Sequence, residues 1–318
     1  MTRTGRRGAT AALLAAVAAG SLMAGCTAGG GGDDGSGHRP PGHDSARGTG
    51  PVLAVKIDNV PQARPQSGLD AADVVYAEQV EGGLSRLMAV YATALPKAVG
   101  PVRSARESDL ELLGQFHDPT LAFSGAQHKL LPLIDDAPLR AVPPGKDAGA
   151  YYRAPDEAAP HNLYLRPRQL MDSAPGTGAL PAGFRFGAAP AGGTPTAERT
   201  VRFPSARFTF TWDEGRRRWL VAMDGAPAVT PEGRRVAPAT VIVQHVKVRA
   251  SRFHDFLGNT TPYTETVGSG KADLLRDGRA WEVGWKRPTA SDGTDFTTAE
   301  GAPVNLAEGQ VWVVLAGD

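Results

Sequence analysis

The chain has 318 residues, of which 41% are hydrophobic and 21% are charged, and this composition excludes a fully disordered protein. Its 34 Lys and Arg side chains nearly balance its 33 Asp and Glu side chains, which leaves a formal charge of +1. Such a balance supplies no basic field for a phosphate backbone, so a nucleic-acid partner is not expected.

The first 25 residues have the features of a signal peptide. Three arginines, the last two being Arg6-Arg7, precede the apolar stretch Ala9–Met23, and the small residues Ala24-Gly25 follow it. This stretch is shorter than the roughly 20 residues that a membrane-spanning helix needs. Residues 1–25 are therefore predicted to be removed, with export by either the general secretory or the twin-arginine route.

Cys26 is the only cysteine of the chain and directly follows this segment. Small residues before a cysteine resemble the cleavage site of bacterial lipoproteins, in which the cysteine is diacylated. Two acyl chains give stable membrane attachment, whereas one gives only reversible attachment. Residues 26–50, rich in glycine, are expected to form the lipidated cysteine and a flexible linker. The predicted location is the outer face of the cytoplasmic membrane.

The next segment, residues 51–175, alternates strand and helix patterns and is expected to form a mixed α/β sheet domain. A helix starting at Ser104 or Ser108 would be capped by that serine, and Pro132 would interrupt a second helix. The expected strands are 51–57, 73–79, 84–92 and 120–123, and the expected helices end at about residue 116 and cover 126–134 and 167–172.

An Ala-, Gly- and Pro-rich linker is expected over residues 176–198, followed by a β-rich domain over 199–318. There the apolar residues recur with period two, and Asp277-Gly278 is typical of a tight hairpin turn. All five tryptophans lie in this part. The complete chain is thus predicted to be an α+β protein whose second domain is an antiparallel β structure.

Familiar catalytic and cofactor motifs are not matched. Gly268-Ser269-Gly270-Lys271 is not a phosphate-binding loop, because Ala272 follows the lysine where Ser or Thr is required. No serine has the flanking glycines of a nucleophile elbow. The histidines do not follow the ligand spacing of a metal site. No cofactor and no metal is therefore predicted. Trp281 and Trp285 share one face of a strand, which favours core packing over sugar binding.

The unusual feature of the first domain is arginine placed beside glycine, proline and acidic residues. Because these runs fall at strand ends or turns, their side chains could converge at the rim of a sheet. Guanidinium groups offer paired donors to phosphate or carboxylate, and Ser104 at a helix start would add backbone donors. The predicted anion-binding residues are Arg64, Arg86, Arg103, Ser104, Arg106, His161 and Asn162.

The same region contains three candidates for a general base, Glu78, Glu81 and His161. A carboxylate close to arginines has a lowered pKa, which favours orienting water over donating a proton. A purely structural alternative is equally open: the four arginines could be neutralised by acids close in sequence, namely Asp70, Asp73, Glu78, Glu81, Glu107 and Asp109.

At these residues the chain resembles a known family. The arginine runs, Val55-Lys56-Ile57-Asp58-Asn59 and the later Glu308-Gly309-Gln310-Val311-Trp312 are similar to YerB-like bacterial lipoproteins, a family of unknown function with N- and C-terminal domains. The resemblance implies a membrane-anchored extracytoplasmic protein that works near the cell envelope, and it supplies no catalytic residues.

Two functions remain open at this stage. The first is a binding lipoprotein, attached to the membrane by its anchor, that holds an anionic wall precursor or a protein of the envelope. The second is an envelope-acting phosphotransferase or hydrolase, in which the arginines neutralise developing charge and one of the three candidate bases moves the proton.

Overall fold

The computed structural model describes residues 48–147, 149–181, 183–255 and 257–318. The predicted signal peptide, Cys26 and most of the predicted linker after it lie outside these residues. None of the helices in the described ranges has the length and apolar character that a membrane span requires.

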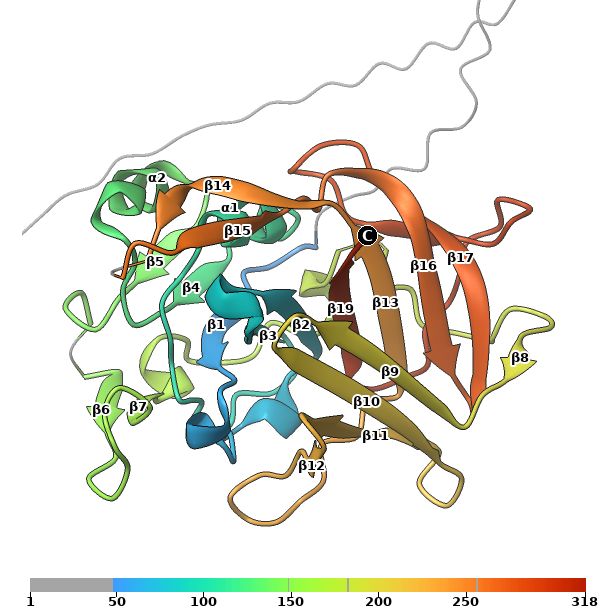
Figure 1. The fold of residues 1–318 in the computed structure, drawn as a ribbon, viewed down its shortest axis with the longest axis horizontal. Coiled ribbons are helices and arrows are strands. Elements are labelled where there is room, and N and C mark those ends of the chain that lie inside the picture. Colours follow the sequence, from blue (N-terminus) through green and yellow to red (C-terminus); the bar gives the residue numbers. More distant parts are fainter. Residues whose placement is uncertain (1–47, 148, 182, 256) are drawn as a thin grey trace, which may run out of the picture. The chain divides into compact units, whose positions relative to one another are not determined.

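A mixed sheet of 11 strands occupies the centre of the described body, and both halves of the sequence contribute to it (Figure 1). Its strands are β1 Leu53–Asp58, β2 Val74–Gln79, β3 Ser85–Tyr91, β4 Thr120–Ala122, β5 Arg140–Val142, β8 Thr194–Pro195, β13 Thr240–Val246, β16 Gly268–Arg276, β17 Arg279–Arg287, β18 Asp295–Thr297 and β19 Val311–Gly317. Their order is β18-β17-β16-β13-β19-β2-β3-β1-β4-β5, and β8 pairs with β17.

Three smaller antiparallel sheets complete the β structure. The first pairs β12 Ala226–Pro227, β11 Arg218–Met223, β10 Ala206–Asp213 and β9 Glu198–Phe203. The other two are the hairpins of β14 Val248–His254 with β15 Thr260–Thr264, and of β6 Tyr151–Arg153 with β7 Leu163–Leu165. The protein is therefore mostly β, with few helices beside a large mixed sheet.

The helices are short, and two expectations about them are wrong. The N-cap of α1 (Glu107–Leu113) is Arg106, whose backbone N–H donates to the Asp109 carboxylate at 2.7 Å, so neither Ser104 nor Ser108 caps it. Pro132 lies in the first turn of α2 (Leu131–Asp136), where a proline needs no N–H partner, and does not interrupt it. The 3₁₀ turns are Pro61–Ala63, Leu69–Ala71, Glu81–Gly83, His128–Leu130, Pro167–Gln169 and Thr177–Ala179.

The last strand, β19, joins the two halves of the sequence. It runs parallel to β13 on one side and parallel to β2 on the other, with Trp312 opposite both Val241 and Val75. The expectation of a purely antiparallel second half is therefore wrong at β19. The reason is burial: Val311–Ala316 are buried on both faces of the sheet, as strands in parallel arrangements usually are.

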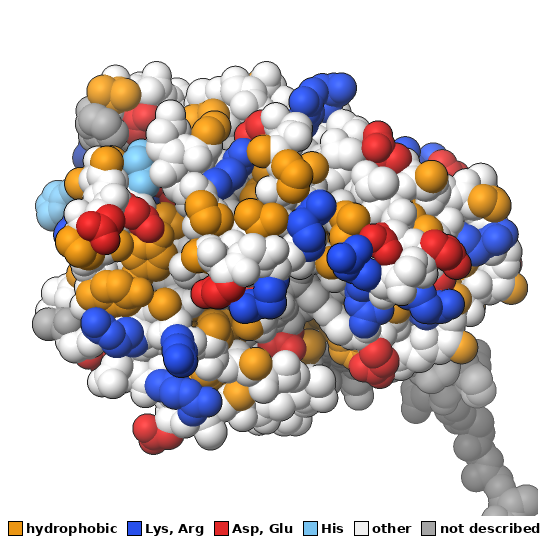
Figure 2. Space-filling model, turned by 90° about the horizontal axis from the view of Figure 1, so that it is seen from below, with side chains coloured by type: hydrophobic (Ala, Val, Ile, Leu, Met, Phe, Trp, Pro, Cys, Tyr) orange, Lys and Arg blue, Asp and Glu red, His pale blue; other side chains and the backbone are white. Residues whose placement is uncertain are grey.

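Each face of the central sheet supports its own apolar core. On one face the Trp312 ring meets Phe208 and Phe210 of the β9–β12 sheet at 5.9 Å between ring centroids. On the other face α1 packs Leu112 and Leu113 over β1, β2 and β3. The molecular surface seen in Figure 2 intersperses basic and acidic side chains, in keeping with the near-zero net charge.

Candidate functional site

The apolar face beneath α1 ends in a row of charged side chains. The register of three strands places Asp58 of β1 and Glu78 of β2 on either side of Arg86 of β3. Lys56 lies two residues before Asp58 and so points to the same face of the sheet. Strand alternation thus gathers four ionisable groups at one end of this face, of which Arg86 and Glu78 belong to the residues predicted from the sequence.

The innermost member of the row, Lys56, is completely buried between two carboxylates. Its ammonium group forms ion pairs with Glu78 and with Asp109 of α1. The Ser108 hydroxyl donates to the second oxygen of Glu78 at 3.1 Å. Glu78 therefore has partners at both oxygens, and this geometry makes it a poor candidate for a general base.

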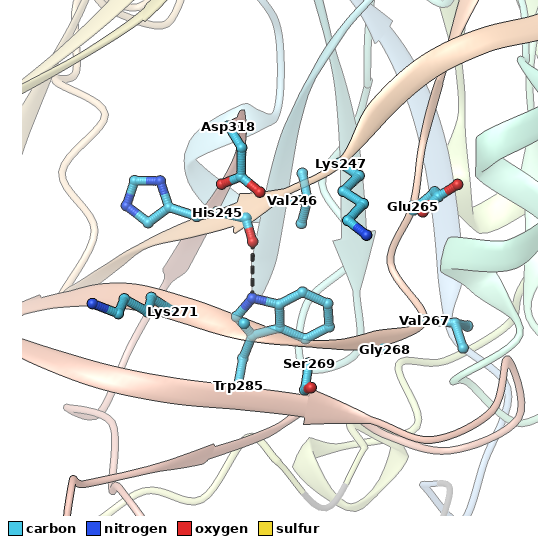
Figure 3. A pocket seen from close by; sticks show the side chains of 11 residues that line it. His245, Val246, Lys247, Glu265, Val267, Gly268, Ser269, Lys271, Trp285 and Asp318 are labelled. Atoms are coloured by element: carbon cyan, nitrogen blue, oxygen red, sulfur yellow. Dashed lines mark hydrogen bonds between the residues drawn. The ribbon is translucent and has the colours of Figure 1, made fainter.

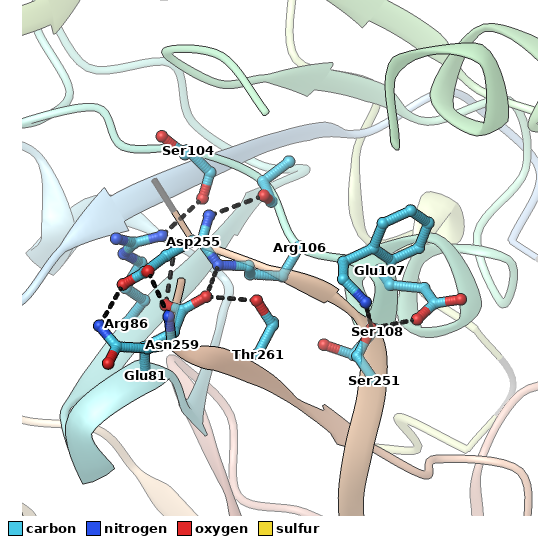
Figure 4. A network of polar contacts seen from close by, with 12 residues as sticks. Glu81, Arg86, Ser104, Arg106, Glu107, Ser108, Ser251, Asp255, Asn259 and Thr261 are labelled. Carbon is cyan, nitrogen blue, oxygen red and sulfur yellow. Dashed lines mark hydrogen bonds and ion pairs between the residues drawn. The ribbon is translucent and has the colours of Figure 1, made fainter. Parts of the chain in front are cut away.

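Arg106 and Glu81 form a bidentate ion pair, visible in Figure 4. The Nε and Nη2 atoms of Arg106 donate to the two Glu81 oxygens at 2.7 and 2.8 Å, and the Thr261 hydroxyl donates at 2.6 Å. Burial alone would raise the Glu81 pKa, but the hydrogen bonds and charge of Arg106, with help from Thr261, outweigh it and lower the pKa. A carboxylate held in this way stays ionised and accepts a proton poorly.

Asp58 holds two further members of the predicted site. Its Oδ2 lies 2.9 Å from Nε of Arg103 and 2.8 Å from Nδ1 of His161. Asp58 is buried, whereas the Arg103 and His161 side chains are 24% and 20% exposed. When Nδ1–H of His161 donates to Asp58, the imidazole is oriented and its Nε2 becomes the acceptor. Of the three candidate bases, His161 is therefore the one that keeps an atom, Nε2, able to accept a proton.

Arg86 differs from its neighbours because no carboxylate of the described residues forms an ion pair with it. Its Nη1 donates to the Ser104 carbonyl at 3.1 Å (Figure 4). The adjacent Asp58 and Glu78 are turned to Arg103 and Lys56 instead. Burial, reinforced by the charges of Arg106 and Arg103, lowers the Arg86 pKa to about 9, which still leaves the group cationic at neutral pH.

Two predicted binding residues lie elsewhere. Arg64 donates to the Asn59 carbonyl at 2.6 Å and pairs with Asp224 at 2.7 Å, linking the first half to the β9–β12 sheet. Asn162 accepts from Arg153 and donates to the carbonyls of Ala154 and Glu157, so it stabilises a loop. The tertiary structure therefore gathers Arg86, Arg103 and Arg106, but not Arg64 or Asn162.

Three of the four arginines form ion pairs with acids, as the structural alternative expects. Most of these acids are not the ones close in sequence. Of the six acids close in sequence, only Glu81 pairs with one of the four arginines. Arg103 uses Asp58 and Arg64 uses Asp224, which is 160 residues away in the sequence. Sequence proximity therefore identifies the correct charge type but, apart from Glu81, not the partners.

A cavity of about 310 Å³ opens beside Ser104 and Arg106, between this cluster and the β14–β15 hairpin. Its carboxylate Asp255 accepts from the backbone N–H groups of Leu257 and Asn259, and Glu107 accepts from Ser251. His128 and His254 both line it, although 126 residues separate them in the sequence and no spacing signal relates them. Among the described residues no group of three or more His, Cys, Asp or Glu is placed to hold a metal ion.

The two tryptophans of β17 are parts of the packing. Trp281 donates to the Ala191 carbonyl at 3.0 Å, and Gly193 lies so close that a Cβ there would meet the indole at 2.4 Å. Trp285 is buried and donates to the His245 carbonyl at 2.9 Å. Both indoles are therefore fixed by hydrogen bonds to backbone carbonyls.

Comparison with known proteins agrees with this architecture. The chain is 24% identical over 282 residues to "Putative lipoprotein YerB" of Bacillus subtilis (strain 168), covering 84% of this chain and 81% of that protein. The crystal structure of the Bacillus subtilis YerB protein superposes with a TM-score of 0.71 at 22% identity, over 84% of this chain and 91% of that one. This likeness shows a shared fold.

Two models of one protein family match the chain, one over each half of the sequence. Residues 39–180 match the N-terminal domain, and residues 199–313 the C-terminal domain, of the family described as "Protein of unknown function (DUF3048)". The resemblance to YerB-like lipoproteins predicted from the sequence is thereby confirmed, and the chain belongs to the DUF3048 family.

Proposed function

We propose that this chain is a membrane-anchored lipoprotein, held by a diacylated Cys26 on the outer face of the cytoplasmic membrane, that binds an anionic group of the envelope through Arg86, Arg103 and Ser104. The similarity to a protein named as a lipoprotein supports the anchor. The tether after Cys26, rich in glycine, would let the body reach ligands near the membrane surface.

The observation behind the anion site is the pairing pattern around Arg86. Lys56 forms ion pairs with Glu78 and Asp109, Arg106 pairs with Glu81, and Arg103 pairs with Asp58 through Nε. Arg86 is left with one carbonyl, and no described acceptor takes a hydrogen bond from the Nη atoms of Arg103. A phosphate or carboxylate would satisfy these donors and relieve the repulsion between the two guanidinium groups.

Calorimetry on the unlipidated Cys26→Ser chain tests this proposal. Inorganic pyrophosphate should bind, and Arg103→Ala should weaken binding about tenfold, because one charge-assisted contact contributes roughly 1.5 kcal/mol or more. Arg168→Ala, an exposed arginine outside the cluster, is the matched control. Flotation with phosphatidylglycerol and phosphatidylcholine vesicles separates a lipid headgroup from a free phosphate as the ligand. Absence of binding to every anion would contradict the proposal.

A second candidate function rests on the contact of His161 with Asp58. An imidazole oriented by a buried carboxylate can act as a general base, and Arg103 beside it could neutralise charge on a phosphoryl group. We therefore also propose an envelope-acting hydrolase or transferase as the alternative. Phosphate release from pyrophosphate that His161→Gln abolishes would support it, and binding without turnover by the wild type would exclude hydrolysis of this probe.

A further inference from the structure

Strand β16 extends beyond the strand that covers its inner edge. Its ladder with β13 runs from Thr240 opposite Arg276 to Gln244 opposite Ala272. Beyond that point Gly268–Lys271 continue to pair with β17 alone, and all four residues are exposed. One edge of this four-residue segment is therefore without a strand partner among the described residues.

The turn between β16 and β17 fixes which backbone groups face this open edge. Asp277 and Gly278 have φ values of 49° and 70°, as a two-residue type I′ turn requires. The flanking pair Arg276 and Arg279 is then hydrogen-bonded, and every second pair along the ladder is too. Gly270 therefore bonds towards β17, and the N–H and C=O of Ser269 point to the open side.

A groove of about 520 Å³ runs along this edge and has Trp285 at its floor (Figure 3). The Trp285 indole crosses over Gly270 to reach the His245 carbonyl, and a Cβ on Gly270 would lie 2.7 Å from Nε1. The His245 carbonyl lies 3.2 Å from the same Cβ position, so β13 still borders β16 at Gly270, and the edge is open beyond it. Two glycines and a serine at the edge leave room for another backbone to approach.

Two lysines line the groove, Lys247 and Lys271. Both are exposed, and neither forms an ion pair with a described carboxylate. Of the two acids that also line it, Glu265 is held by Arg249 at 2.8 Å, and Asp318 faces the groove. Lysines on an edge strand oppose pairing with a second copy, since equal charges would meet, and favour an acidic strand.

We propose that Gly268–Lys271 is a docking edge, at which an extended acidic segment of a partner protein adds as a further strand to β16. Backbone hydrogen bonds to Ser269 supply affinity, and Lys247 and Lys271 select negative charge. This site lies in the second half of the chain and is independent of the anion site around Arg86.

Fluorescence anisotropy with the unlipidated full chain tests the edge. The probe is a labelled peptide, Thr-Val-Glu-Val-Asp-Val-Glu-Thr, and its twin has lysine in place of each acid. The acidic peptide should bind at least tenfold more tightly than its twin. Ser269→Pro, which removes the outward N–H and also fixes φ, should weaken binding about tenfold, whereas Ser269→Ala keeps the N–H and should bind as the wild type does.

Hydrogen exchange gives a second readout, which locates the bound peptide on the chain. The amides of Ser269 and Lys271 should gain protection when the acidic peptide is present, and circular dichroism should show that both Ser269 variants are folded. Equal binding of the two peptides, unchanged binding by Ser269→Pro, or absence of protection at these amides would each overturn the proposal. Dimerisation of the chain abolished by Ser269→Pro would assign the edge to a second copy and overturn it too.

Discussion

The Nζ of Lys56 donates to Oδ1 of Asp109 at 2.7 Å, with both side chains completely buried. Burial lowers the Lys56 pKa to about 8, and the attraction of Asp109 only partly opposes this. In the unfolded chain a lysine titrates near pH 10.4. Between these two values the unfolded chain holds more protons than the folded protein, so stability rises with pH across this window.

We therefore expect the free energy of unfolding to increase by about 2 kcal/mol from pH 7 to pH 9.5, relative to the change in Lys56→Met. Urea unfolding of both proteins at several pH values measures this difference. Lys56→Met should also be several kcal/mol less stable at pH 7, because two buried carboxylates lose their partner. Parallel pH profiles for the two proteins would show that Lys56 titrates normally.

The Arg106–Glu81 pair should stabilise the protein in a pH-dependent way. Glu81→Gln is expected to cost about 3 kcal/mol at pH 7, because Arg106 then lies partly buried without its charge partner. Since the folded pKa of Glu81 is lowered, the difference between wild type and variant should be present above about pH 4.3 and shrink as the pH falls below it. Glu282→Gln, at an exposed position of β17, is the control and should be neutral at both ends of the range.

Gly270 should tolerate no side chain, in contrast to a glycine on the neighbouring strand. Gly270→Ala places a Cβ 2.7 Å from Trp285 Nε1, whereas at Gly284 the nearest contact would be an ordinary 3.5 Å. We expect a loss of about 1–3 kcal/mol for the first change and little effect for the second. Thermal unfolding compares the two, and a shift in tryptophan emission would report displacement of the indole. Equal stability of the variants would mean that Trp285 can move freely.

The proposed lipid anchor at Cys26 makes a prediction about location. Cys26→Ser should release the protein from the membrane fraction and abolish incorporation of labelled palmitate, because no other cysteine can accept an acyl chain. Fractionation of cells expressing either form measures this. Cys26→Ser protein that remains in the membrane fraction after a salt wash would indicate another mode of attachment.

Local patterns in the sequence predicted individual elements well. The period-two residues around Phe208 and Phe210, and the Asp277-Gly278 turn, correspond to observed strands and an observed hairpin. The charges at strand ends correspond to the row formed by Asp58, Glu78 and Arg86. These features depend on residues close together in the chain, whose side-chain alternation fixes which face they share.

Local patterns do not identify which strands pair across the sheet or which distant side chains form ion pairs. β19 lies between β13 and β2, so the final strand completes a sheet that the first half begins. Lys56 is central to the charged row, but a lysine inside an apolar strand gives no sign that Asp109 and Glu78 will enclose it. Arg64 resembles the other arginines in its sequence context, yet its partner Asp224 comes from the second half.

The sequence by itself determined the family, and it predicts an export signal before the single cysteine and the residue types of the candidate site, since each is encoded by neighbours along the chain. Only the tertiary structure decided that, within the described ranges, no carboxylate pairs with Arg86 and no strand covers the Ser269 edge of β16. Both facts depend on how segments that are far apart in the sequence lie next to each other in the folded protein. Ion pairing and strand pairing are settled by spatial neighbours, and these are chosen by packing of the whole sheet.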